Sequence, residues 1–274
     1  MIHAANLIKN GTTDNFPIPL ESDSRLPSVH PAAGVFLSPA VKNPIIAALD
    51  VPDAEGALKL AEAIAPAVGA FKIGKELFVS AGPDIVRRVR DTGAAVFLDL
   101  KFHDIPNTVA KAVASATRLD IQMLTVHASG GTAMLQGALQ GARKAATETG
   151  HDAPLVLGVT VLTSMDESDL TEVGLQKSPA DQVLHLAKLA TQAGLKGLVC
   201  SPQEIALLRE VLPPEVQLVT PGIRPADART SDQKRVMTPA DAIAAGANWL
   251  VIGRPIYAAE NPRQAADGIL DSLP

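Results

Sequence analysis

The sequence has little of three features that mark common protein classes. Among its 274 residues Cys200 is the only cysteine, which excludes an internal disulfide framework and is typical of the reducing cytosol. The longest apolar runs, such as PLVLGVTVL, are far shorter than the roughly 18–20 residues that span a bilayer. The formal net charge is −5 and no run of lysine or arginine occurs, whereas a nucleic-acid-binding domain usually presents a basic face. We therefore expect a cytoplasmic protein that binds neither nucleic acid nor a membrane.

The composition is that of a folded protein with an atypical beginning. Hydrophobic residues make up 47% of the chain and charged residues 19%, which supports a well-buried core. The N-terminal region is polar, rich in proline and without periodicity, and it lacks the apolar segment of a secretory signal. We expect residues 1–43 to form an irregular N-terminal extension and residues 44–274 to form a single domain.

Short runs rich in isoleucine, valine, leucine and phenylalanine alternate with alanine-rich amphipathic stretches throughout this domain. The alternation predicts strands that are each followed by a helix. The predicted strands cover residues 45–50, 69–74, 95–101, 121–127, 155–162, 197–201, 216–220 and 249–253. The predicted helices cover residues 54–66, 82–92, 106–118, 130–149, 178–194, 202–212, 238–246 and 262–272.

Strands that alternate with helices favour a parallel sheet, because parallel neighbours need a crossover connection. Eight such units at this length are typical of an α/β fold of the (β/α)8 type, the TIM barrel. An open, doubly wound sheet is the alternative, but LDVPDAEG at the end of the first predicted strand is not the glycine-rich fingerprint of a dinucleotide site. In a barrel the chemistry takes place at the carboxyl ends of the strands, so the polar residues there are the site candidates.

The end of the third predicted strand, FLDLKFHDIPNTV, carries a high density of charge between apolar residues. Asp99 and Lys101 lie two residues apart, so their side chains point to the same face of the strand. Lys72, at the end of the neighbouring second strand, extends them to a compact row of alternating charge. The alternatives are a structural ion pair at the barrel mouth and, for Asp104, a cap on a helix that begins at Pro106.

The last two connections from strand to helix indicate an anion site. The loop PGIRPADARTSDQKRVMTP, residues 221–239, is long and polar, and ordered loops of this length are usually functional. IGRPIY then places Gly253 and Arg254 at the end of the eighth strand. Phosphate groups often bind there in this fold, and a guanidinium is a permanently charged planar donor. We expect Arg254 to bind a phosphate and Gln233 to close over it; the alternative is an ordinary loop with a solvated arginine.

Seven segments along the chain carry a family resemblance, and they occur in this order: ALDV, FKIGKELF, LDLKFHDIPNTV, VTVLTS, TPGIRP, DQKRVMTP and VIGRP. With them the chain resembles the orotidine 5′-phosphate decarboxylases over the whole predicted barrel. The resemblance implies a homodimer that converts orotidine 5′-monophosphate to uridine 5′-monophosphate and CO2 in pyrimidine biosynthesis. It implies that no metal and no organic cofactor takes part.

The resemblance also implies roles for residues at the matching positions. The implied catalytic residues, the last of which reaches into the site of the partner subunit, are Lys72, Asp99, Lys101 and Asp104. The implied substrate contacts are Asp50, Lys72, Ile105, Thr108, Thr163, Pro221, Arg224, Gln233, Gly253 and Arg254. Asp50 and Lys72 match the contacts to the ribose hydroxyls, and Thr163 matches the residue that recognises the pyrimidine edge. Ile105 and Thr108 lie beside Asp104, and the phosphate contacts are Gln233, Gly253 and Arg254.

Two other functions compete with this interpretation. A metal-dependent decarboxylase of the 3-keto-gulonate 6-phosphate type shares the barrel and a D-x-K-x-x-D pattern. It has an acidic metal ligand where this chain has Lys72, whose charge repels Mg²⁺. A non-catalytic barrel that binds a phosphorylated sugar needs the phosphate site but not the charged row.

Overall fold

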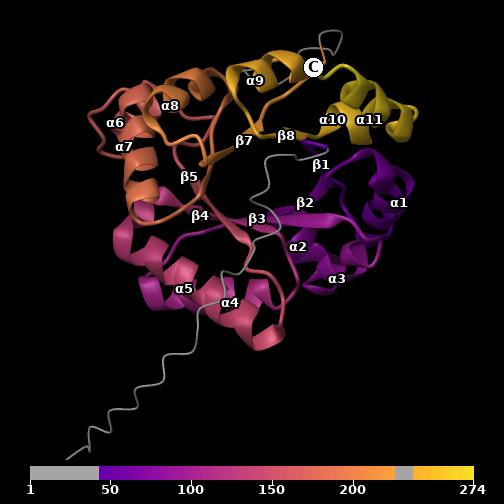
Figure 1. Ribbon diagram of the computed structural model, residues 1–274, viewed down its shortest axis with the longest axis horizontal. Helices are drawn as coiled ribbons and strands as arrows, with labels where there is room; N and C mark the ends of the chain where they lie inside the picture. Colours follow the sequence, from indigo (N-terminus) through magenta and orange to yellow (C-terminus); the bar gives the residue numbers. More distant parts are fainter. Residues whose placement is uncertain (1–42, 226–236) are drawn as a thin grey trace, which may run out of the picture. The chain divides into compact units, whose positions relative to one another are not determined.

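Eight parallel strands close into a barrel in the order in which they occur in the sequence (Figure 1). The structure, a computed structural model, describes residues 43–225 and 237–274. The strands are β1 Ile45–Ala48, β2 Ala70–Gly74, β3 Ala95–Phe102, β4 Met123–His127, β5 Leu155–Val159, β6 Gly197–Val199, β7 Gln217–Pro221 and β8 Trp249–Ile252. Each predicted strand is present, so the (β/α)8 barrel is confirmed and the open sheet was the wrong alternative. The predicted N-terminal extension, apart from residue 43, and Gln233 lie outside the described residues.

Helices follow the strands and surround the barrel (Figure 1). They are α1 Ala54–Ile64, α2 Lys75–Ala81, α3 Asp84–Arg90, α4 Pro106–Thr117, α5 Gly131–Thr149, α6 Glu167–Glu172, α7 Pro179–Gln192, α8 Ile205–Val211, α9 Pro239–Ala245, α10 Arg254–Tyr257 and α11 Pro262–Asp271. Short 3-10 helices are η2 Ala65–Ala67, η3 Ala128–Gly130 and η4 Pro202–Glu204. The sequence did not predict α2, α6 and α10, which are four to seven residues long and lie in the connections between the predicted strands and the longer predicted helical stretches. In the described ranges, no helix combines the length and apolarity needed to cross a membrane.

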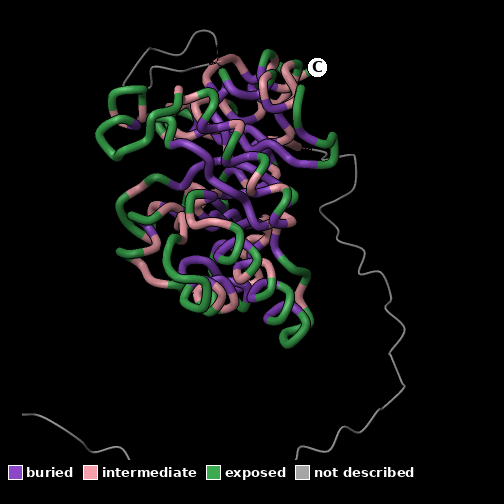
Figure 2. Tube along the Cα trace, turned by 90° about the vertical axis from the view of Figure 1, so that its left-hand side faces the viewer, coloured by how far each residue is buried: buried purple, intermediate pink, exposed green. Residues whose placement is uncertain are grey.

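Two layers of apolar side chains hold the barrel together, because alternate residues of a strand face opposite sides of the sheet. Leu98 and Leu250 belong to the outer layer, between strands and helices. The inner layer fills the barrel with Ile46, Ala48, Ala70, Phe97, Met123, Leu157, Val219, Trp249 and Val251. Figure 2 shows these buried strands at the centre of the barrel and exposed segments at its periphery. The filled interior confines the polar residues at the strand ends to one mouth of the barrel.

Strand β3 loses its regular register with β4 just before it ends. Leu98 pairs with Leu124, but the next pair is Phe102 with Val126, so β3 uses more residues than β4 over the same length. Within the extra segment the backbone of Lys101 has a φ of 53°, in the left-handed region. For a residue other than glycine such a conformation costs of order 1–3 kcal/mol, and it is most common at functional sites. The irregular segment is the one that carries the predicted charged residues of β3.

Candidate active site

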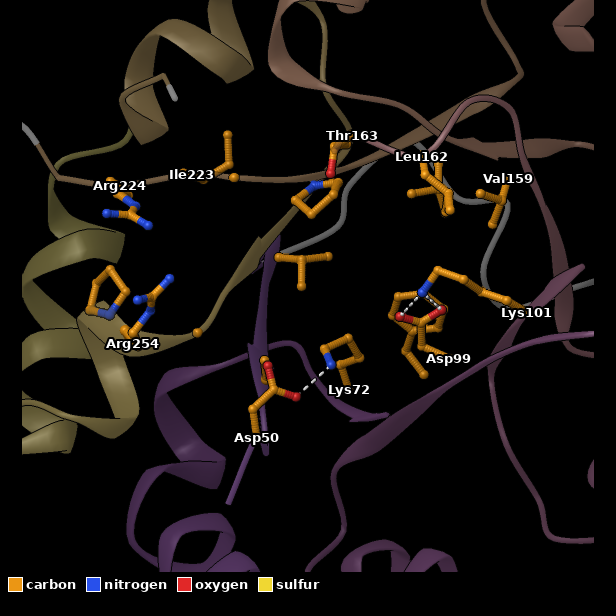
Figure 3. Close-up of a pocket in the computed structure, with 18 of the residues that line it drawn as sticks. Asp50, Lys72, Asp99, Lys101, Val159, Leu162, Thr163, Ile223, Arg224 and Arg254 are labelled. Atoms are coloured by element: carbon orange, nitrogen blue, oxygen red, sulfur yellow. Dashed lines mark hydrogen bonds and ion pairs between the residues drawn. The ribbon is translucent and has the colours of Figure 1, made fainter. Parts of the chain in front are cut away.

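A cavity of about 510 Å³ opens at the carboxyl ends of the strands (Figure 3). Its size is typical of sites for small organic ligands. The predicted site residues that line it are Asp50, Lys72, Asp99, Lys101, Thr163, Pro221, Arg224, Gly253 and Arg254. These residues come from six different strands or the loops that follow them, and the barrel brings them together.

The charged residues of the cavity form two ion pairs. Lys101 Nζ lies 2.8 Å from both carboxylate oxygens of Asp99, and Lys72 Nζ lies 2.7 Å from Asp50 Oδ1. Lys72 pairs with Phe97 of β3 rather than with Asp99, which places it one inward-facing position deeper in the barrel. The four charged side chains therefore share one cavity. They form two ion pairs, whereas the sequence predicted a single row of alternating charge.

Three of these four charges are held where little water reaches them, whereas the side chain of Asp50 is 46% exposed. The exposed fraction of the side chain is 12% for Lys72, 15% for Asp99 and 27% for Lys101. Pairing opposite charges offsets part of the cost of removing each one from water. A Cβ atom at Gly74 would lie 3.1 Å from Lys72 Nζ, so glycine at this position leaves room for the lysine to reach Asp50. Over residues 43–225 and 237–274, no group of three His, Cys, Asp or Glu side chains is arranged to hold a metal ion.

One wall of the cavity is apolar and was missed by sequence reasoning. It consists of Val159, Val161 and Leu162 at the end of β5, and Figure 3 shows Val159 and Leu162 beside the Asp99–Lys101 pair. In the sequence these residues could not be distinguished from ordinary core residues, because a short apolar run does not show which of its residues line a cavity. The wall limits the access of water to the ion pair.

Two arginines mark the other end of the cavity. Arg224 follows β7 and Arg254 begins α10 directly after β8, and Figure 3 shows both on the side away from Asp99 and Lys101. The backbone N–H of Arg224 donates to the carbonyl of Met237 at 3.1 Å, which holds the two ends of the loop together. Two guanidinium groups at one cavity end suit an anionic ligand group such as a phosphate.

Asp104, Ile105 and Thr108 do not line this cavity. All three are exposed, and Ile105 has an exposed fraction of 67%. The prediction that Asp104 caps α4 is wrong, because Pro106 is the first helical residue and the capping position falls on Ile105. Asp104 Oδ1 instead accepts a hydrogen bond of 2.6 Å from the backbone N–H of Ile105. None of the three side chains therefore contributes to the cavity of its own chain.

His127, at the end of β4, is a further titratable group close to Asp99 and Lys101. Its ring centroid lies 5.4 Å from that of His103. Burial lowers the pKa of His127 below its ordinary value, and the neighbouring His103, Lys101 and Lys75 lower it further, while Asp99 opposes them. Because the environment disfavours the imidazolium, His127 is held neutral over a wider pH range than a free histidine.

Replacing His127 with asparagine should remove part of the acid sensitivity of the fold. The pKa of His127 is lower in the folded chain than its ordinary value of 6.5, so the unfolded chain takes up the proton first as the pH falls. The full stability is present above that value and is lost as the pH falls through the folded-state pKa. The loss is below about 1.4 kcal/mol for each unit of pKa lowering, because solvent screens a half-buried group. Urea unfolding at about pH 8 and about pH 5 measures it.

The matched control for this experiment is His185→Asn, because His185 is exposed on α7. We expect the control to keep the wild-type difference in unfolding free energy between the two pH values, and His127→Asn to reduce it. An equal pH dependence in His127→Asn and the wild type contradicts the assignment.

Comparison with known proteins shows which family this barrel belongs to. A model of the family described as Orotidine 5′-phosphate decarboxylase / HUMPS family matches residues 43–269. Orotidine 5′-phosphate decarboxylase of Opitutus terrae is 54% identical over 229 residues, 84% of this chain and 97% of the relative. The enzyme of that name from Moorella thermoacetica is 52% identical, over 83% of this chain and 91% of the relative.

A solved structure agrees with these relatives. The crystal structure of orotidine 5′-phosphate decarboxylase from Lactobacillus acidophilus superposes with a TM-score of 0.74 at 39% sequence identity, and the match covers 83% of this chain and 97% of that one. The family match extends over almost the whole described barrel, including every strand that contributes to the cavity. The chain belongs to the orotidine 5′-phosphate decarboxylase / HUMPS family.

Proposed function

We propose that this chain decarboxylates orotidine 5′-monophosphate to uridine 5′-monophosphate and CO2 in pyrimidine biosynthesis, without a metal or an organic cofactor. One observation carries the proposal: a single cavity holds a poorly hydrated Asp99–Lys101 pair at one end and Arg224 and Arg254 at the other. The relatives at 52% and 54% identity, which bear the name of this enzyme over nearly their full length, support it.

The chemical step needs an electrostatic catalyst. When the bond between C6 and the carboxylate breaks, its electron pair stays in an sp² orbital that the ring π-system cannot delocalise. A fixed positive charge close to C6 therefore stabilises the carbanion as it forms. Lys101 supplies that charge and then transfers a proton from Nζ to C6, and solvent returns a proton to the amine. The bond is broken and formed at one carbon, and the only by-product is CO2.

Asp99 has two effects in this scheme. It fixes the ammonium of Lys101 through both carboxylate oxygens. It also lies close to the departing carboxylate, and two like charges about 4 Å apart repel each other by roughly 4 kcal/mol at an effective dielectric constant near 20. The repulsion disappears as the carboxylate becomes neutral CO2. We assign the larger share of catalysis to the preorganised Lys101, because its interaction with the substrate grows toward the transition state.

The remaining cavity residues bind the nucleotide. The Asp50–Lys72 pair contacts the ribose hydroxyls, and Thr163 recognises the edge of the pyrimidine. Gly253 and Arg254 bind the phosphate. Pro221, Arg224 and Gln233 complete this end of the cavity, although Gln233 lies outside the described residues. Binding energy from the phosphate, which does not react, can be used to orient C6 against Lys101.

The functional unit in this proposal is a cytoplasmic homodimer with shared sites. Asp104, Ile105 and Thr108 of one subunit enter the cavity of the other, and Asp104 becomes the fourth charged group beside C6. Their exposure and their absence from the cavity lining of their own chain support this arrangement.

A spectrophotometric assay with orotidine 5′-monophosphate tests the function. We expect an absorbance decrease as the substrate is consumed, at a rate that EDTA does not change. Loss of the activity in EDTA would point to the metal-dependent type of enzyme on the same barrel. Binding of uridine 5′-monophosphate without any turnover of orotidine 5′-monophosphate would show a non-catalytic binding protein. Either result overturns the proposal.

A further inference from the structure

Thr125 is a fully buried polar residue inside the barrel. It lies on β4 two residues after Met123, a member of the inner apolar layer, and therefore faces the same way. A hydroxyl group that is removed from water needs hydrogen-bond partners. Both partners of Thr125 Oγ1 belong to β3, and both are catalytic residues of the proposed reaction.

The first partner is the backbone of Lys101. Beyond the Leu98–Leu124 pair, Thr125 is the β4 residue that faces the extra segment of β3. The N–H of Lys101 donates to Thr125 Oγ1 at 2.9 Å. The hydroxyl thus accepts a hydrogen bond from a backbone N–H at the point where regular pairing between β3 and β4 is interrupted. Lys101, which donates this bond, has a φ of 53°, a backbone conformation that is unfavourable for a lysine.

The second partner is the carboxylate of Asp99. Thr125 Oγ1 donates to Asp99 Oδ1 at 2.9 Å, and the same oxygen accepts from Lys101 Nζ at 2.8 Å. The backbone of Lys101, the hydroxyl, the carboxylate and the ammonium therefore form a closed cycle. One hydroxyl fixes the backbone that carries the catalytic ammonium and the carboxylate that holds it.

We propose that Thr125 is a positioning residue that keeps the Asp99–Lys101 pair in its reactive geometry. It is not among the residues that line the cavity, so it acts through its two neighbours and does not touch the substrate. This inference rests on the proposed function, because it names the reaction that the geometry serves. Its consequence is that Thr125 supports kcat and has little effect on nucleotide binding.

Thr125→Val tests the proposal, because valine keeps the branched shape but can neither donate nor accept a hydrogen bond. We expect kcat for orotidine 5′-monophosphate to fall about 10- to 100-fold, since hydrogen bonds to charged groups are lost. The dissociation constant of uridine 5′-monophosphate should change less than about threefold, and Thr125→Ser, which keeps the hydroxyl, should restore most of kcat. Thr220→Val removes a hydroxyl that is equally buried, on β7, and should leave kcat unchanged.

The proposal is overturned if Thr125→Val keeps the wild-type kcat, or if Thr125→Ser is as impaired as Thr125→Val. If the valine variant does not fold, Thr125→Cys replaces it, and its weak thiol donor should give a smaller loss in the same direction.

If the wild type has no activity on orotidine 5′-monophosphate, the proposed function fails, and crystal structures of the variants decide the positioning role. That role stands if Lys101 or the Asp99 carboxylate reorients in Thr125→Val alone, and it fails if neither moves.

Discussion

Replacing Lys101 with methionine should lower kcat for orotidine 5′-monophosphate by at least about 10⁴-fold. Methionine keeps much of the length of the side chain but has neither a charge nor a proton to transfer. A positioned general acid typically contributes about 10²- to 10⁴-fold, and removal of one preorganised group that faces developing charge costs about 10²- to 10³-fold. Lys101 is proposed to provide both effects at the same carbon atom. Single-turnover absorbance measurements with excess enzyme give the rate of the chemical step.

The controls separate catalysis from folding and binding. Lys59→Met changes an exposed lysine on α1 that pairs with Glu55, and it should keep the wild-type kcat. Lys101→Met should still bind uridine 5′-monophosphate, because the groups assigned to the ribose and the phosphate remain. A variant at Lys101 that retains more than about a hundredth of the wild-type kcat contradicts its role as proton donor.

The barrel could be predicted because its signal is repeated along the chain. Each strand is a short apolar run followed by an amphipathic stretch, and an error at one boundary does not change the count of units. The cavity followed from the same reasoning, since a closed parallel barrel brings the strand ends to one mouth. Asp50, Asp99 and Arg254 could therefore be placed together although they are far apart in sequence.

The details that fix the geometry of the charges could not be predicted. The register break in β3 and the φ of Lys101 depend on pairing with β4, and no local pattern of letters shows them. Thr125 looked like an ordinary strand residue for the same reason. The pairing of Lys72 with Asp50 depends on the depth of each side chain in the barrel, which is set by the register between strands. Sequence periodicity shows which face of a strand a side chain lies on, but it does not show how deep in the barrel that residue lies.

A mixture of the Lys101→Met and Asp104→Ala proteins should regain activity that neither protein has alone. If Asp104 enters the partner's cavity, a hybrid dimer contains one site with both substitutions and one site with neither. Random exchange of subunits places half of the chains in hybrids, so roughly a quarter of the wild-type activity should return. The measurement is the decarboxylation rate before and after exchange, with hybrid formation followed by native mass spectrometry.

A second mixture makes the test specific. Asp99 and Lys101 lie 2.8 Å apart in one cavity of one chain, so hybrids of Asp99→Asn with Lys101→Met contain no site that is free of both changes. This mixture should show no recovery. Recovery in both mixtures, or in neither despite proven exchange, contradicts the shared site. The end of β3 and the loop after it would supply two sites at once in this arrangement: Asp99 and Lys101 line the chain's own cavity, and the exposed Asp104, three residues beyond Lys101, lies outside that lining. A complete set of charges beside C6 then exists only when two chains are paired, which makes catalysis depend on assembly.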